Sequence, residues 1–246
     1  MALIKELLEK KEGKKVLHFT LIDPEDQAPS EAGRMAKISQ GYGTDAIMVG
    51  GSTVKETKLV DETVKEIKEN CSLPVILFPN SSEAVSQFAD YIFFMSMLNS
   101  KDRKYLLEEQ LNGALLVKKF NLKPIPMAYI LISTSVLKTQ VERASQLDAI
   151  KMYDIKKAVN YALAAKYLGM QCIYLEAGSG AEHSVPNEMI SEVKKEVKIP
   201  IIVGGGIRNG RVAREKVKAG ADVIVTGTMV EEKLEALKEI IEAMKK

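Results

Sequence analysis

Cysteine is scarce in this sequence: only Cys71 and Cys172 occur among 246 residues. They have no metal-ligand spacing, so we expect buried free thiols in a reducing cytoplasm. Excess charge is lacking too, since the net charge is only +2, which gives no basis for binding nucleic acid. No apolar run approaches the ~20 residues of a membrane span, and Met1–Gly13 has a charged helical pattern unlike a signal peptide. We expect a soluble cytoplasmic protein with no nucleic-acid partner and no transmembrane segment.

Glycine is concentrated near the C-terminus, where two short apolar runs are each followed by a turn. Gly204–Gly206 follow the run Ile201–Val203, and Gly227 and Thr228 follow the run Val223–Val225, with a helical pattern between. Glycine lets backbone N–H groups approach an anion, and the next helix N-terminus adds a favourable dipole. In (β/α)8 barrels the loops after strands 7 and 8 often form the phosphate site. The pattern therefore indicates a phosphate site, although a triple glycine is also compatible with a simple tight turn.

Apolar runs and helical patterns alternate over the whole chain. The runs are near-continuous, as expected for parallel strands covered on both faces, and they are Val16–Ile22, Ala46–Val49, Pro74–Phe78, Tyr91–Met95, Ile125–Ile132, Cys172–Leu175, Ile201–Val203 and Val223–Val225. The helical patterns are Pro29–Gln40, Val54–Glu69, Ser82–Phe88, Arg103–Phe120, Ile155–Leu168, Asn187–Val197, Asn209–Ala219 and Val230–Met244. This order predicts an α/β protein with a single (β/α)8 TIM barrel spanning residues 1–246 and an additional N-terminal helix. An open doubly wound sheet is the alternative fold.

One connection does not follow the repeat. Ser133–Asp154 is too long for an ordinary loop, and Val136–Leu147 has a pattern compatible with a helix.

The active site of such a barrel lies at the C-terminal ends of its strands. Only two carboxylates stand at a strand's own end there, Asp23 and Glu176. Asp23 precedes a proline, so it also fits a common turn opener, with Glu25 and Asp26 as solvated charges. Glu176 has little reason to be present for packing, which favours a functional role. The other polar residues and glycines at strand ends are Ser52, Asn80, Ser96, Ser133, Gly204–Gly206, Gly227 and Thr228.

Two familiar kinds of barrel chemistry lack their residues. No lysine lies within or at the end of a predicted strand, which argues against a Schiff-base aldolase. His18 is expected to fill the barrel interior, and His183 lies in a loop, so the two histidines form neither a triad nor a metal set. What remains is a phosphate site with one acid on each of two strands. Oxygen ligands of this kind suit Mg²⁺, which usually keeps several waters.

Five motifs at these strand ends resemble one enzyme family, the archaeal geranylgeranylglyceryl phosphate synthases. They occur in the family's order between about Leu17 and Gly227, and they are Thr20–Pro24, Val49–Ser52, Phe94–Asn99, Tyr174–Gly180 and Val203–Arg208. The Glu-Ala-Gly-Ser-Gly run favours the archaeal type over the bacterial heptaprenylglyceryl phosphate synthases, which share the architecture.

The resemblance implies a reaction and a set of binding residues. The family joins sn-glycerol 1-phosphate to geranylgeranyl diphosphate, forming 3-O-geranylgeranylglyceryl 1-phosphate and diphosphate, the first ether bond of archaeal membrane lipids. Asp23 and Ser52 would then hold Mg²⁺ at the diphosphate. The glycerol phosphate would be bound by Tyr174, Leu175, Glu176, Ala177, Gly178, Ser179, Gly180, Gly205, Gly206, Gly227 and Thr228.

The same resemblance suggests roles in catalysis. Mg²⁺ would neutralise the leaving diphosphate, and Glu176 would accept the proton of the attacking glycerol hydroxyl. Tyr174 would present an aromatic face to the developing allylic cation. The prenyl chain needs an apolar groove, and one candidate wall, equally suited to ordinary core, comprises Phe93, Phe94, Met95 and Met97.

The family pattern breaks at Ser133–Asp154, which contains no glycine or proline here, whereas we expect both in relatives. The resemblance further implies a homo-oligomer and allows a transient contact with the membrane surface.

Two other functions remain open. A phosphate-sugar isomerase or lyase would use the same phosphate site without needing Mg²⁺ or an apolar groove. A non-catalytic barrel that binds a phosphate ligand is the other, although the carboxylates count against it.

Overall fold

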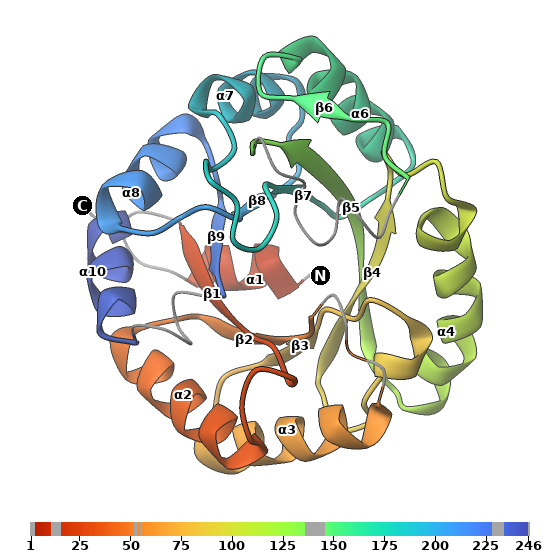
Figure 1. The fold of residues 1–246 in the computed structure, drawn as a ribbon, viewed down its shortest axis with the longest axis vertical. Coiled ribbons are helices and arrows are strands. Elements are labelled where there is room, and N and C mark those ends of the chain that lie inside the picture. The colour runs from red at the N-terminus through yellow and green to blue at the C-terminus, as the bar shows by residue number, and fades with distance from the viewer. Residues whose placement is uncertain are drawn as a thin grey trace.

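The fold is an eight-stranded parallel barrel surrounded by helices (Figure 1). In the computed structural model, residues 3–10, 16–51, 54, 56–135, 146–227 and 234–245 are described. The ring consists of β1 (Leu17–Ile22), β2 (Ala46–Val49), β3 (Val75–Leu77), β4 (Tyr91–Met97), β5 (Lys123–Ser133), β7 (Cys172–Glu176), β8 (Ile201–Gly204) and β9 (Val223–Thr226). Each strand pairs in parallel with its neighbours, and the pairings β1–β9 and β4–β5 close the ring. The predicted (β/α)8 barrel is therefore confirmed.

Helices cover the outside of the ring, as the strand composition requires. They are α2 (Pro29–Tyr42), α3 (Thr57–Asn70), α4 (Glu109–Lys119), α6 (Ile155–Tyr167), α7 (Asn187–Glu196), α8 (Gly210–Ala219) and α10 (Leu234–Lys245). Because successive strand residues point to opposite faces, Leu17 and Phe19 enter the interior cluster, whereas Ile22 packs with Ala32 and Met35 of α2. The strands are thus covered on both faces over most of their length, which explains the near-continuous apolar runs.

A further helix, α1 (Leu3–Lys10), lies across the opening at the N-terminal ends of the strands (Figure 1). Leu3 and Ile4 are buried in the interior cluster, together with Leu17 and Phe19 near the start of β1. The predicted N-terminal helix is confirmed, and it covers the end of the barrel opposite the strand ends that carry the candidate site.

The segment after β3 contains less helix than its pattern predicted. Only a 3-10 turn, Ser82–Ala84, forms where we expected a helix reaching Phe88, and Ser81 before it makes no side-chain cap. Val85 has an extended backbone, and the Ser86 hydroxyl accepts a hydrogen bond from the Phe88 N–H at 3.2 Å. A short polar side chain that bonds a nearby N–H offers the backbone an alternative to helix.

The long connection after β5 contains a ninth strand, β6 (Ile150–Lys151), which pairs in parallel with Ile132 and Ser133 at the end of β5. The helix predicted from Val136 falls almost entirely outside the described residues. Earlier in the chain, between β4 and β5, the helix predicted from Arg103 is divided, because a π-helical turn, η2 (Lys104–Glu108), precedes α4.

Both cysteines are buried free thiols, as predicted.

The prediction that His18 fills the barrel interior is wrong. Leu17 and Phe19 point into the barrel, so the alternation turns the His18 ring outward. There it hydrogen-bonds the hydroxyls of Thr44 at 2.8 Å and Thr226 at 3.0 Å. These two hydroxyls, which lie between the barrel and its helices, replace the hydrogen bonds to water that the imidazole loses when it is buried.

Candidate active site

Glu176 is the last residue of β7, and its side chain is buried, with 6% of the residue exposed. Its Oε1 accepts a hydrogen bond from the Gly178 N–H at 2.6 Å, and the Tyr174 hydroxyl donates a second one. Burial raises the pKa of Glu176 above its ordinary value of 4.5, although hydrogen bonds from Gly178, Tyr174 and Ala177 act in the opposite direction. A carboxylate with a raised pKa at a strand end is suited to accept a proton from a substrate hydroxyl.

Gly204 and Gly205 leave the space that the Tyr174 and Glu176 side chains occupy. A Cβ on Gly204 would lie 2.2 Å from the Tyr174 hydroxyl oxygen, and a Cβ on Gly205 would lie 2.4 Å from Glu176 Oε1. Gly205 also has a φ of +78°, in the left-handed region that favours glycine. These two glycines therefore have a packing role beside Glu176, in addition to the role in phosphate binding predicted for Gly205.

The glycine-rich loops after β7 and β8 lie directly against each other. A Cβ on Gly205 would approach the Gly178 nitrogen at 2.7 Å, and a Cβ on Gly206 would approach the His183 carbonyl carbon at 2.7 Å. The structure thus brings the predicted stretches Gly178–Gly180 and Gly205–Gly206 together beside Glu176. Backbone N–H groups gathered in such turns form concave anion sites, which is the local chemistry that a phosphate group requires.

Other residues of the predicted phosphate site have different positions. Gly227 follows β9, and a Cβ there would lie 3.3 Å from the Leu21 side chain of β1. Thr228 lies outside the described residues. Leu175 and Ala177 are buried in the apolar cluster between the barrel and its helices, so only their backbone atoms can face a ligand at the strand ends.

An aromatic cluster that the sequence analysis missed surrounds Tyr174 inside the barrel. The Phe78 ring stacks on Tyr174 with centroids 5.6 Å apart, and the Tyr129 ring meets Tyr174 edge-on at 5.4 Å. Phe93 extends the cluster through an edge contact with Phe78 at 6.1 Å. Tyr129 pairs in register with Tyr174 on the neighbouring strand. Side chains alternate between the two faces of a strand, so the alternation along β5 indicates from the sequence that Tyr129 points into the interior with Tyr174.

Asp23 follows β1, and its carboxylate lies against the backbone after β2. A Cβ on Gly51 would lie 1.8 Å from Asp23 Oδ2, so only glycine leaves room for this carboxylate. The pKa of Asp23 is raised to about 6, chiefly by burial; the Glu25 N–H bond opposes this shift, and the nearby charges of Asp26 and Glu25 contribute to it. Its predicted partner Ser52 adjoins Gly51 in sequence but lies outside the described residues.

A metal at this place would depend on few protein ligands. Within the described residues, no group of three or more His, Cys, Asp or Glu side chains is arranged to hold a metal ion. The Gln27 amide donates to the Asp23 carbonyl, and its side-chain oxygen is buried without a hydrogen-bond partner in the described part of the chain. One carboxylate and nearby amide oxygen fit Mg²⁺, which is often bound by one or two carboxylates plus waters and substrate phosphates.

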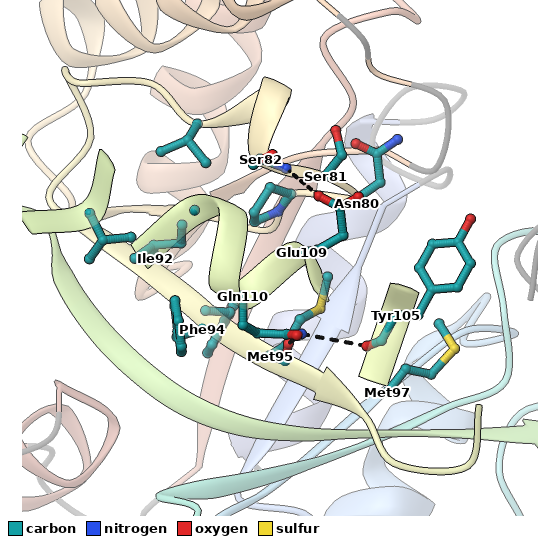
Figure 2. A pocket seen from close by; sticks show the side chains of 15 residues that line it. Asn80, Ser81, Ser82, Ile92, Phe94, Met95, Met97, Tyr105, Glu109 and Gln110 are labelled. Atoms are coloured by element: carbon teal, nitrogen blue, oxygen red, sulfur yellow. Dashed lines mark hydrogen bonds between the residues drawn. The ribbon is translucent and has the colours of Figure 1, made fainter. Parts of the chain in front are cut away.

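An apolar pocket opens between β4 and α4 (Figure 2). Its empty volume is about 530 Å³, including the part open to solvent. Its wall includes all four residues predicted to line a groove for the prenyl chain, namely Phe93, Phe94, Met95 and Met97. Phe93 links the pocket to the aromatic cluster around Tyr174, because it lines the pocket and its ring also contacts Phe78.

Polar contacts fix the walls of this pocket. The carboxylate of Glu109 accepts a hydrogen bond from the Ser82 N–H at 2.8 Å, which ties α4 to the turn after β3. The amide of Gln110 donates to the Met95 carbonyl, which ties α4 to β4 (Figure 2). The pocket therefore has a defined shape between two fixed elements.

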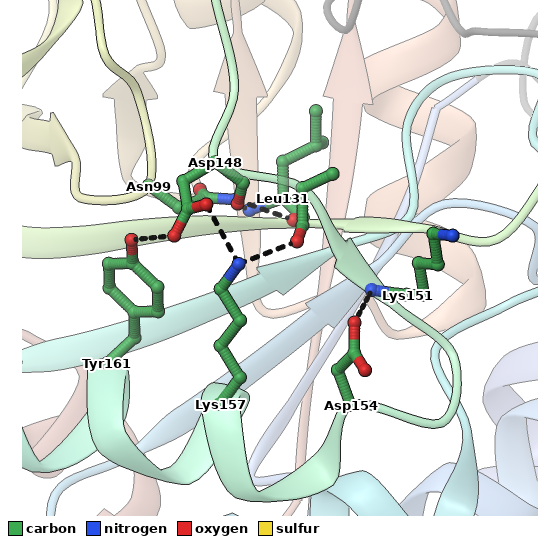
Figure 3. A network of polar contacts seen from close by, with 8 residues as sticks. Asn99, Leu131, Asp148, Lys151, Asp154, Lys157 and Tyr161 are labelled. Carbon is green, nitrogen blue, oxygen red and sulfur yellow. Dashed lines mark hydrogen bonds and ion pairs between the residues drawn. The ribbon is translucent and has the colours of Figure 1, made fainter.

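A second polar network lies at the ends of β4 and β5 (Figure 3). The buried Asn99 amide donates to the Leu131 carbonyl at 2.9 Å and accepts from the Leu131 N–H at 3.0 Å. Asp148 forms an ion pair with Lys157 at 2.9 Å and accepts a hydrogen bond from the Tyr161 hydroxyl at 2.8 Å. These contacts hold the described end of the long connection to α6, and they explain the asparagine of the Phe94–Asn99 motif as a structural residue.

Comparison with known proteins agrees with this geometry. The sequence pattern that defines the PcrB family matches residues 7–244 of this chain. The chain belongs to the PcrB family. Geranylgeranylglyceryl phosphate synthase of Pyrococcus furiosus is 51% identical over 228 residues, which are 93% of this chain and 90% of that protein. The synthase of Methanosarcina acetivorans is 49% identical over 217 residues, which are 88% of this chain and 87% of that protein.

Solved structures of relatives have the same fold. The (S)-3-O-geranylgeranylglyceryl phosphate synthase of Thermoplasma acidophilum, in complex with its substrate sn-glycerol-1-phosphate, superposes with a TM-score of 0.92. Its sequence is 41% identical, and the match covers 100% of this chain and 99% of that one. None of the helices in the described part of this chain has the length and apolar character that a membrane crossing requires.

Proposed function

We propose that this protein is a geranylgeranylglyceryl phosphate synthase, a prenyltransferase that joins sn-glycerol 1-phosphate to geranylgeranyl diphosphate. One observation carries the proposal: the buried Glu176 lies between the glycine loops after β7 and β8 and the aromatic cluster around Tyr174, and Phe93 of this cluster also lines an apolar pocket. A base between a phosphate site and an apolar pocket is the arrangement that this transfer requires. Relatives about half identical in sequence carry the same activity in their names.

Glycerol phosphate would bind with its phosphate on the N–H groups of Ser179, Gly180, Gly205 and Gly206, because the Gly178 N–H already donates to Glu176 Oε1. Glu176 would then accept a hydrogen bond from the 3-hydroxyl and take its proton as that oxygen attacks C1 of the prenyl chain. A new carbon–oxygen bond forms, the bond from C1 to the diphosphate oxygen breaks, and diphosphate leaves with the bonding electrons. The raised pKa of Glu176 suits this step, because general-base catalysis is most efficient when the pKa approaches the working pH.

The rings around Glu176 would stabilise the positive charge that develops on the allylic carbon. Tyr174 and Phe78 are stacked, and Tyr129 meets both rings edge-on. An aromatic face attracts a nearby cation, most strongly where water is excluded. The prenyl tail would extend past Phe93 into the pocket between β4 and α4.

Mg²⁺ would be held at the diphosphate by Asp23, with Ser52 as a second predicted ligand. The chemistry that bound Mg²⁺ supplies is neutralisation of the charge on the leaving diphosphate. Asp23 itself favours a cation, because Asp26 and Glu25 add negative charge around a half-buried carboxyl. Desolvation of a carboxylate costs less free energy when a cation neutralises it.

The assembly and location expected from the sequence also stand as proposals. Exposed leucines on α4, chiefly Leu111 at 59% and Leu115 at 78% exposure, offer an apolar surface for a second copy of the chain. We propose a homo-oligomer in the cytoplasm that contacts the membrane surface transiently to deliver its product. Light scattering of the purified protein measures its oligomeric state directly.

The decisive experiment is incubation with labelled geranylgeranyl diphosphate and sn-glycerol 1-phosphate, with and without Mg²⁺, followed by organic extraction. We expect an extractable phosphate product and released diphosphate, both dependent on Mg²⁺. The absence of product, together with tight binding of a phosphorylated sugar, would instead favour the isomerase class, which shares the phosphate site.

A further inference from the structure

The loop after β7, residues 177–186, contains the glycines of the proposed glycerol phosphate site, and it is held by side chains from three neighbouring elements. Within the loop, the Ala181 N–H donates to the Gly178 carbonyl at 3.1 Å and closes a turn. Its Gly178 side is tied to Glu176, because the Gly178 N–H donates to Glu176 Oε1 at 2.6 Å. The following residues of the loop are held by side chains from outside it, and the most numerous of these contacts come from Arg208.

Arg208 follows the glycine triplet after β8 and donates hydrogen bonds to three successive carbonyls of the loop. Nη2 donates to the Ala181 carbonyl at 2.8 Å and to the Gly180 carbonyl at 3.3 Å, and Nη1 donates to the Glu182 carbonyl at 3.2 Å. No carboxylate among the described residues forms an ion pair with Arg208. A planar guanidinium that is permanently charged and presents its donors in a rigid fork suits this arrangement.

The opposite side of the same loop rests on the end of β5. The Thr134 hydroxyl donates to the His183 carbonyl at 2.6 Å, and the Ser135 hydroxyl accepts from the Glu182 N–H at 2.9 Å. Glu182 is therefore held through its carbonyl by Arg208 and through its N–H by Ser135. Two fixed barrel elements, the ends of β5 and β8, thus determine the position of the loop.

A buried lysine fixes the far end of the loop. Lys216 of α8 is 5% exposed, and its Nζ donates to the Val185 carbonyl and to the Asn187 side chain, both at 2.7 Å. At the other end, the Gly178 N–H is held by the buried Glu176 carboxylate. The middle of the loop, Gly180–His183, is held by Arg208 and by the hydroxyls that follow β5.

We propose that Arg208 is a positioning residue for glycerol phosphate: it holds the Gly180–Glu182 side of the turn in the place that phosphate binding requires, while Glu176 holds the Gly178 side. The proposal rests on the proposed function, because it assigns the phosphate of that substrate to the turn. Arg208 acts through the backbone rather than by contact with the reacting atoms. Its loss therefore weakens glycerol phosphate binding and leaves the prenyl diphosphate side of the site unchanged.

The test compares Arg208→Gln and Arg208→Lys with a matched control, Arg211→Gln. Arg211 is an exposed arginine nearby on α8, and among the described residues its ion-pair partner is Glu215 of the same helix, at 2.8 Å. Calorimetry with sn-glycerol 1-phosphate alone gives Kd, and transfer kinetics give KM for each substrate. A melting curve of each variant shows whether it is folded at the assay temperature.

We expect both Arg208 variants to raise Kd and KM for glycerol phosphate about ten-fold, equivalent to about 1.4 kcal/mol. KM for geranylgeranyl diphosphate and the behaviour of Arg211→Gln should match the wild type. Lysine cannot reproduce the fork, so a fully active Arg208→Lys would overturn the proposal by showing that positive charge alone suffices. An unchanged Kd in Arg208→Gln would overturn it too. Binding of glycerol phosphate by the wild type without any transfer product would remove the proposed function and leave the role of Arg208 intact.

Discussion

The contact between Gly205 and Glu176 gives the sharpest test of the site. Gly205→Ala adds a Cβ at 2.4 Å from Glu176 Oε1, whereas ordinary contact begins at 3.4 Å. The carboxylate must therefore move by about 1 Å, and a misplacement of about 1 Å at a catalytic group can lower the rate by about 10²-fold. The same Cβ would lie 2.7 Å from the Gly178 nitrogen, so the carboxylate cannot move without disturbing the donor that holds it.

Gly169→Ala is the matched control, because Gly169 has a φ of +79° and Gly205 one of +78°. A Cβ on Gly169 meets nothing within 4 Å. Both variants incur the cost of a left-handed alanine, about 1–2 kcal/mol. Gly205→Ala adds overpacking, typically about 1–3 kcal/mol, so its loss of stability should be about 2–5 kcal/mol.

Urea denaturation measures the two stabilities, and kcat at saturating substrates measures the displacement of Glu176. We expect Gly169→Ala to retain wild-type kcat and Gly205→Ala to lose about 10²-fold. If the two variants had equal kcat and equal stability, the close packing of Glu176 against Gly205 would not matter for catalysis, and the assignment of Glu176 as the base would lose its geometric support.

Three further predictions concern the carboxylates and the substrate. Glu176→Gln should lower kcat about 10²–10⁴-fold. Because the pKa of Glu176 is raised in the folded state, the wild type loses stability as pH rises above 4.5, and the melting temperature of the variant relative to wild type should therefore rise with pH. Parallel plots of melting temperature against pH for the two proteins would contradict this. Asp23→Asn should lose most activity even in excess Mg²⁺, and the Mg²⁺ concentration for half-maximal wild-type rate should fall as pH rises through about 6, where Asp23 loses its proton. In the transfer assay, sn-glycerol 1-phosphate should be preferred over sn-glycerol 3-phosphate by about ten- to a hundred-fold in kcat/KM, since a misplaced hydroxyl leaves buried polar groups unpaired. Equal rates would exclude a site in which the glycine loops fix the phosphate, Glu176 fixes the hydroxyl and the bound diphosphate sets the direction of attack.

The barrel was predictable because its signals are local and repeated. A parallel strand buried on both faces must be apolar throughout. Runs such as Ala46–Val49 and Val223–Val225 can therefore be recognised as strands without knowledge of the neighbouring strands. The positions of Asp23 and Glu176 followed from the same rule, since each stands where an apolar run ends.

Features that depend on distant partners were not predictable from local pattern. Phe78 looks like an ordinary strand residue, and its contact with Tyr129 and Tyr174 appears only when the closed barrel brings the end of β3 across the interior from β5 and β7. The outward direction of His18 depends on which parity of β1 faces the interior, and Phe19 beside it fixes that parity. The helix expected to reach Phe88 failed because the Ser86 side chain satisfies the Phe88 N–H.

The glycine triplet after Val203 shows why a motif can have several physical causes at once. A Cβ on Gly204 would collide with the Tyr174 hydroxyl, on Gly205 with Glu176, and on Gly206 with the backbone at His183. Each glycine thus admits a different neighbour, and two of these neighbours are the proposed catalytic residues. Substitution of the triplet cannot weaken phosphate binding alone, because the same backbone sets the position of the base. In this site, substrate binding and proton transfer depend on one piece of backbone, so kcat and the affinity for glycerol phosphate should fall together in Gly205→Ala.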